Sequence, residues 1–172
     1  MSITRRKVSN METNQPKGEV TMERVFDAPL ELVWKAWTDP ELMAKWWGPR
    51  GVTNPICEVD ARVGGDMHIV MLAGKEMGSF QGTRWPMTGK FTAVVPSKKL
   101  VYTAVAIEDK KNSPMFETVT TVGFEAVGKK TRLTLHMAVT KVINLPQAKF
   151  AIDGMNAGWA QSLDKLGEEL EG

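Results

Sequence analysis

The chain has 172 residues, with 22 basic and 20 acidic side chains mixed along its length and a formal net charge of +2. A chain of this length buries roughly two-thirds of its unfolded surface, which is enough for one hydrophobic core. The mixed, nearly balanced charge provides no field that would gather nucleic acid or an anionic membrane, so we expect neither as a partner.

The cysteine and histidine content argues against an internal disulfide and against a structural zinc site. Cys57 is the single cysteine, so the chain forms no internal disulfide, and no Cys/His cluster indicates a zinc site. No apolar run reaches the length of about eighteen residues that a membrane span needs. The basic residues 5–7 are followed by the polar segment 8–18, which lacks the apolar part of a signal peptide. We therefore expect a soluble, cytoplasmic protein without a metal.

The N-terminal residues 1–16 are polar and contain few apolar side chains. Burial of so few apolar side chains cannot offset the entropy lost when the segment is ordered. We therefore expect a flexible tail. We assign residues 17–172 to a single domain.

The domain begins with a strand and two short helices. Residues 19–26 alternate between apolar and polar side chains and predict a first strand. Asp27 is a candidate helix cap with Pro29 in the first turn, and Asp39 followed by Pro40 repeats this signal. The second helix should end at the Gly-Pro pair at 48–49.

From residue 56 to about residue 140 the pattern is typical of an antiparallel meander. Turn-forming residues interrupt strand-like runs at 64–65, 74, 96–98, 110–112 and 128–129. In the last run, Leu133, Leu135, Met137 and Val139 should face the core, and His136 should point outward.

A long helix is predicted over residues 147–169. Gly154 and Gly158 lower its intrinsic stability by about 1 kcal/mol each relative to alanine, unless they permit close approach to the sheet or leave space for a ligand. The sequence leaves both explanations open. The apolar stripe of this helix consists of Ile152, Met155, Trp159, Leu163, Leu166 and Leu170.

Several sequence blocks are similar to one known family. They are VFDAP at 25–29, VWKAWTDP at 33–40, WWGP at 46–49, CEVDARVGG at 57–65, and the helix residues 154–159 with Leu163 and Leu166. Together they resemble the activator-of-heat-shock-protein-90-ATPase homologue family of the START-like (SRPBCC) superfamily, over roughly residues 17–170. The resemblance implies an α+β helix-grip fold. In that fold a curved antiparallel sheet of about six or seven strands wraps around a long C-terminal helix.

The segment GTRWPM at 82–87 departs from the commoner pattern of the family. Its proline, Pro86, cannot donate a ladder hydrogen bond. An edge strand, a bulge or the rim of a pocket is therefore expected there.

The candidate ligand site lies between the sheet and the long helix. Trp85, Met155 and Trp159 are the preferred lining residues, because the loop before Trp85 should meet the helix that carries the other two. His68 is included because one face of its strand must look inward, although the sequence does not settle which face. The weaker candidates are Met87, Phe80, Phe116 and Phe150.

The leading functional hypothesis is that the protein binds a small hydrophobic molecule as a carrier or sensor and uses no cofactor. No nucleophile, zinc, dinucleotide or phosphate-loop signature is present, so an enzyme is the less favoured class. One alternative resembles the cofactor-free aromatases and cyclases, with His68 and Arg84 as the residues to test. The other is a chaperone-interacting module, which rests on the resemblance alone. The oligomeric state stays open, a homodimer included.

Overall fold

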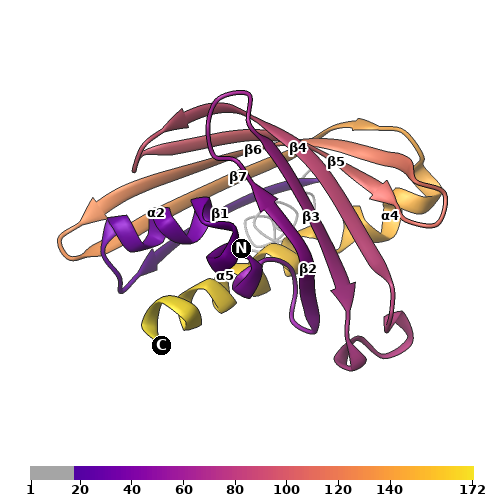
Figure 1. Cartoon of the computed structure of the whole chain (residues 1–172), viewed down its shortest axis with the longest axis horizontal. Coiled ribbons are helices and arrows are strands. Elements are labelled where there is room, and N and C mark those ends of the chain that lie inside the picture. The colour runs from indigo at the N-terminus through magenta and orange to yellow at the C-terminus, as the bar shows by residue number, and fades with distance from the viewer. Residues whose placement is uncertain (1–17) are drawn as a thin grey trace, which may run out of the picture.

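The computed structural model describes residues 18–172, and seven strands there form one antiparallel sheet that curls around a C-terminal helix (Figure 1). The predicted tail at 1–16 lies outside the described residues. The elements are β1 (Glu19–Phe26), α2 (Leu30–Thr38), α3 (Pro40–Trp46), β2 (Val52–Val59), β3 (Asp66–Ala73), the 3-10 helix η1 (Lys75–Phe80), β4 (Arg84–Val95), β5 (Lys99–Glu108), β6 (Ser113–Val127), β7 (Lys130–Val142), α4 (Leu145–Asp153) and α5 (Met155–Glu171). This confirms the predicted α+β helix-grip architecture.

The sheet has the order β1-β7-β6-β5-β4-β3-β2. Each strand from β2 to β7 pairs with its neighbour in sequence, while β1 pairs with β7 and closes the other edge. In Figure 1, α5 runs across the concave side of this sheet, and α2 lies near the turn that joins β6 and β7. None of the helices within residues 18–172 is both long and apolar enough to cross a membrane.

The two short helices form where they were predicted, but the first is capped differently. The N-cap of α2 is Pro29, with extended backbone and no side-chain hydrogen bond, so the prediction that Asp27 caps this helix is wrong. Because Pro29 fixes φ near the value for an extended N-cap, the chain turns into the helix without a capping side chain. Asp39 does cap α3, where its carboxylate accepts a 2.9 Å hydrogen bond from the backbone N–H of Glu41.

The strands extend slightly beyond the predicted meander. β2 begins at Val52 and β7 continues to Val142, because both ends stay paired with a neighbouring strand. His136 points outward as predicted, with its side chain half exposed and its Nε2 atom 2.8 Å from a carboxylate oxygen of Glu19.

Pro86 lies in β4, where that strand has a partner on one side only. β4 pairs with β3 from Arg84 onward, but it pairs with β5 only from Met87 onward. Pro86 therefore occupies a local edge of the sheet, where its missing N–H leaves no gap in a second ladder.

The C-terminal helix is divided into two, which corrects the prediction of one helix over residues 147–169. α4 ends at Asp153 and α5 begins at Met155, with Gly154 between them at φ −90° and ψ −1°. A side chain at Gly154 would meet only backbone oxygens of α4, the nearest at 3.4 Å, and one at Gly158 would meet nothing within 4 Å. Neither glycine is therefore needed for close approach to the sheet.

Candidate functional site

The concave face of the sheet carries two adjacent rows of side chains whose sizes differ. The first, which we call the hydroxyl row, combines large apolar side chains with two hydroxyl groups. The second, the small row, consists of small or β-branched residues. In order across β7, β6, β5 and β4, the hydroxyl row is Met137, Thr120, Tyr102 and Phe91, and the small row is Val139, Thr118, Ala104 and Gly89.

The small row lies where two hydrophobic clusters meet, because Ala104 belongs to the larger cluster and Val139 packs against the smaller one. The larger cluster contains Leu163 and Leu166 of α5 packed on the sheet, and the smaller one contains Phe116 of β6 with Ala148 and Ile152 of α4. Gly89 must be a glycine, because a Cβ at this position would lie 2.2 Å from the backbone oxygen of Thr103. The concave face of the sheet therefore has a strip of low side-chain volume across β7, β6, β5 and β4.

Tyr102 and Thr120 contribute buried hydroxyl groups that none of the residues 18–172 satisfies. Tyr102 is 2% exposed and Thr120 is 1% exposed, and neither hydroxyl has a hydrogen-bond partner within residues 18–172. By contrast, the buried hydroxyls of Thr131 and Ser162 donate to the backbone oxygens of Ala28 and Gly158. Buried polar groups are nearly always paired, so two unpaired hydroxyls side by side mark this part of the interior as unusual.

The same burial affects the acidity of the phenol. Loss of solvent around Tyr102 raises the pKa of its hydroxyl well above 10, and the nearby Thr120 hydroxyl opposes the shift, although the two do not meet in a hydrogen bond of acceptable geometry. Tyr102 is therefore a neutral hydrogen-bond donor throughout the physiological pH range.

Three of the predicted site residues pack around these two rows. Met87 faces inward on β4, and Met155 and Trp159 project from the first turns of α5. Met155 packs against both hydrophobic clusters and therefore lies where they meet. Such a flexible thioether adapts to differently shaped neighbours.

Trp159 is held firmly by its surroundings. Its indole lies parallel to that of Trp37 with ring centroids 6.0 Å apart, and its Nε1 atom donates to the sulfur of Met137 at 3.4 Å. Trp47 packs edge-on against it at 5.2 Å. The indole N–H of Trp37 is also buried and has no acceptor among the described residues.

The predicted aromatic residues form a second group at one end of the sheet. Phe80 of η1 lies 4.9 Å from Phe150 of α4 and 6.3 Å from Trp85 of β4, measured between ring centroids. Phe80 is 38% exposed and Phe150 is 60% exposed, so this chain of rings lies at the surface. Phe116 is buried in the smaller hydrophobic cluster, with Ala148 and Ile152 of α4.

His68 does not join the predicted site. On β3 the residues that contact the core are Met67 and Ile69, so His68 faces the convex side, where Nδ1 lies 3.7 Å from a carboxylate oxygen of Glu58. Side chains alternate along a strand, so His68 must point to the face opposite the one that Met67 and Ile69 occupy. Arg84 pairs with Leu72 on the same convex side.

Within residues 18–172, no three His, Cys, Asp or Glu side chains gather closely enough to hold a metal ion.

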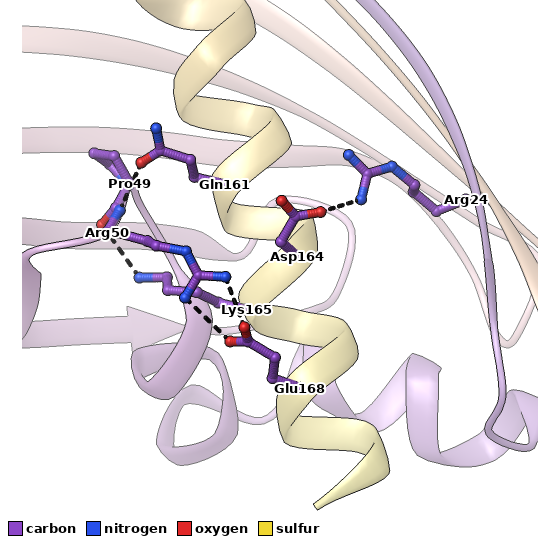
Figure 2. Close-up of polar contacts among 7 residues, drawn as sticks. All are labelled: Arg24, Pro49, Arg50, Gln161, Asp164, Lys165 and Glu168. Atoms are coloured by element: carbon purple, nitrogen blue, oxygen red, sulfur yellow. Dashed lines mark hydrogen bonds and ion pairs between the residues drawn. The ribbon is translucent and has the colours of Figure 1, made fainter.

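Polar contacts fix the C-terminal half of α5, as Figure 2 shows. Asp164 pairs with Arg24 of β1 at 2.5 Å, and Glu168 receives both guanidinium N–H groups of Arg50. Lys165 donates to the backbone oxygens of Trp47 and Pro49, and both its burial and the charge of Arg50 lower its pKa. These contacts tie α5 to β1 and to the loop after α3.

Sequence reasoning did not identify Tyr102 and Thr120. Strand alternation was a usable signal, because Tyr102 lies between Leu100 and Ala104 on one face of β5 and therefore points inward with them. The pairing of Tyr102 with Thr120 depends on the register between two strands, which a single sequence does not determine.

Comparison with known proteins agrees with this architecture. The profile of the family described as Activator of Hsp90 ATPase homolog 1-like protein matches residues 27–171. The chain belongs to this family. No curated protein matches the chain.

Solved structures of bacterial proteins share the fold of this member of the Activator of Hsp90 ATPase homolog 1-like family. Protein NE0264 from Nitrosomonas europaea is 26% identical with a TM-score of 0.68, and the alignment covers 91% of this chain and 96% of that one. Protein CV1439 from Chromobacterium violaceum is 25% identical with a TM-score of 0.71, covering 90% and 98%. The AHSA1 protein SPO3351 from Silicibacter pomeroyi is 25% identical with a TM-score of 0.70, covering 89% and 97%.

Proposed function

We propose that this protein binds a small, largely apolar molecule between the concave face of the sheet and helices α4 and α5, as a carrier or sensor. The observation that carries this proposal is the pair of buried hydroxyls of Tyr102 and Thr120 beside the small row, which have no hydrogen-bond partner in the part of the chain that the structure describes. A hydroxyl that loses water without gaining a partner costs about 1–3 kcal/mol. A bound molecule would supply the missing partner.

The surroundings of the hydroxyls support an apolar ligand. Met87, Met155 and Trp159 present thioether and indole surfaces, which contact irregular apolar molecules well. Ligand sites usually combine such apolar walls with a few polar groups that fix orientation. The chain's START-like family, whose members commonly bind hydrophobic ligands, also supports the proposal.

Filling the small row tests this proposal. The probe is N-phenyl-1-naphthylamine, a neutral molecule whose fluorescence increases in apolar surroundings. Ala104→Leu adds volume in the middle of the small row, and Val105→Leu adds volume on the opposite face of the same strand. We expect saturable binding to the wild type and to Val105→Leu, and at least tenfold weaker binding to Ala104→Leu. Absence of saturable binding, or equal binding by both variants, would contradict the proposal.

A further inference from the structure

We propose that the bound molecule carries an uncharged carbonyl group whose oxygen accepts hydrogen bonds from the hydroxyls of Tyr102 and Thr120. This inference rests on the proposed ligand binding and names the chemical class of the ligand.

The two hydroxyls are placed to act on one atom. Tyr102 on β5 and Thr120 on β6 are direct cross-strand partners, and both side chains are buried on the concave face of the sheet. Cβ atoms of such partners lie about 5 Å apart, so both side chains can reach an acceptor that lies between them.

The group that the ligand supplies must be an acceptor. Each hydroxyl carries one proton, so a hydrogen bond between Tyr102 and Thr120 would use one O–H and leave the other without an acceptor. The neighbours in the hydroxyl row are Met137 and Phe91, which offer no oxygen. The sulfur of Met137 already accepts from the indole N–H of Trp159. The hydroxyl protons of Tyr102 and Thr120 therefore outnumber the hydrogen-bond acceptors in the hydroxyl row.

The acceptor must also be uncharged. No Lys, Arg, His, Asp or Glu occurs in the hydroxyl row or the small row, and the next inward-facing row consists of Phe116, Ala106, Met87, Ile69 and Cys57. A buried carboxylate without a cation loses much more hydration energy than two neutral hydroxyls return. A ligand alcohol would bring a further proton to a site that already has too few acceptors. A ketone, ester or amide oxygen has two lone pairs and no proton, and it fits both hydroxyls.

A matched set of naphthalene compounds tests the inference by displacement of N-phenyl-1-naphthylamine. The set is 2-acetylnaphthalene, its alkene isostere 2-isopropenylnaphthalene, the alcohol 1-(2-naphthyl)ethanol and the anion 2-naphthoate. In the wild type we expect the ketone to bind more tightly than the other three. Tyr102→Phe and Thr120→Val should each weaken ketone binding roughly threefold to tenfold and leave alkene binding unchanged.

A control variant and a spectroscopic measurement separate recognition from a general change of structure. Thr121→Val removes a hydroxyl from the convex face of β6, next to Thr120, and should change neither affinity. The carbonyl stretching frequency of bound 2-acetylnaphthalene should be lower in the wild type than in Tyr102→Phe, because hydrogen bonds weaken the C=O bond.

The possible failures are distinguishable. If N-phenyl-1-naphthylamine binds but ketone and alkene displace it equally, or the alcohol or anion displaces it best, carbonyl recognition is wrong and apolar binding stands. If the carbonyl frequency is the same in the wild type and in Tyr102→Phe, the hydrogen bond from Tyr102 does not exist. If no probe binds at all, both the inference and the proposed function are wrong.

Discussion

The hydroxyls of Tyr102 and Thr120 are buried without a hydrogen-bond partner among residues 18–172, and their cost to the protein without a ligand can be measured. Tyr102→Phe removes a phenol oxygen that has no partner among the described residues, so it should leave the free energy of unfolding unchanged or raise it by about 1 kcal/mol. Thr131→Val is the matched control, because it removes a hydroxyl that donates to the backbone of Ala28 at 2.8 Å.

The control should lower the free energy of unfolding by about 1–3 kcal/mol, since the oxygen of Ala28 would lose its partner. Urea unfolding of the protein without added ligand measures both changes. If Tyr102→Phe destabilises the protein as much as Thr131→Val does, the phenol has a partner in solution and the basis of the proposed function is lost.

Cys57 gives a prediction of pH dependence. It faces the core from β2, and burial raises its thiol pKa from 9.0 to about 11. Below pH 9 the thiol is neutral in both the folded and unfolded states. As the pH rises from 9 to 11, the unfolded thiol ionises first, so this group lowers stability over that range.

Alkylation by iodoacetamide, followed by intact mass, reports the same shift, because the thiolate is the reactive form and the chain has one cysteine. The folded protein should reach half of its maximal rate near pH 11 and the urea-unfolded protein near pH 9. Equal midpoints would show that the folded thiol is not desolvated.

Individual side chains show where prediction from sequence stops. Met155 and Trp159 could be predicted to face the sheet, because a helical stripe of apolar residues has one buried face. His68 could not be placed, since in its strand both faces carry apolar residues and only the register with β2 and β4 decides between them. The hydroxyl pair depends on register in the same way.

At the scale of elements, the break between α4 and α5 is the main feature that periodicity did not reveal. The apolar stripe continues on both sides of Gly154, so the pattern alone predicts one helix, whereas in the structure α4 ends at Asp153 and packs on Phe116 of β6. Turns between strands were easier to predict, because residues such as Gly64 adopt positive φ and interrupt the strand pattern visibly.

The break leads to a prediction about two glycines. Gly154→Ala should raise the free energy of unfolding by up to about 1 kcal/mol, because Gly154 has helical backbone angles, alanine favours the helix, and the added Cβ makes only an ordinary contact at 3.4 Å. Gly89→Ala should lower it by about 1–3 kcal/mol, because its Cβ would collide with the backbone of Thr103. Thermal or urea unfolding compares the two. A loss of stability in Gly154→Ala as large as in Gly89→Ala would mean that the break requires glycine.

At the scale of the whole molecule, the curved sheet and the C-terminal helices were predictable because several separate sequence blocks agree with one family. The sequence did not predict how the contacts of α4 and α5 with the rest of the protein are distributed. α5 is tied to β1 through Asp164 and to the loop after α3 through Lys165 and Glu168, whereas α4 rests on the sheet through Ala148 and Ile152. Both helices therefore pack on the sheet through apolar side chains, but α5 is held by ion pairs and hydrogen bonds to other elements as well.

This difference predicts which of the two helices, α4 or α5, opens more readily. Backbone amides of α4 should exchange with deuterated water faster than those in the C-terminal half of α5, because local opening of α4 breaks fewer contacts between elements. Arg50→Ala removes the pairing with Glu168 and should accelerate exchange in α5 but not in α4. Lys149→Ala, which removes an ion pair within α4, is the control and should leave α5 unchanged. Equal exchange rates in the two helices of the wild type would contradict this prediction. The polar contacts of α5 would then not restrain it, and α4 and α5 would open together.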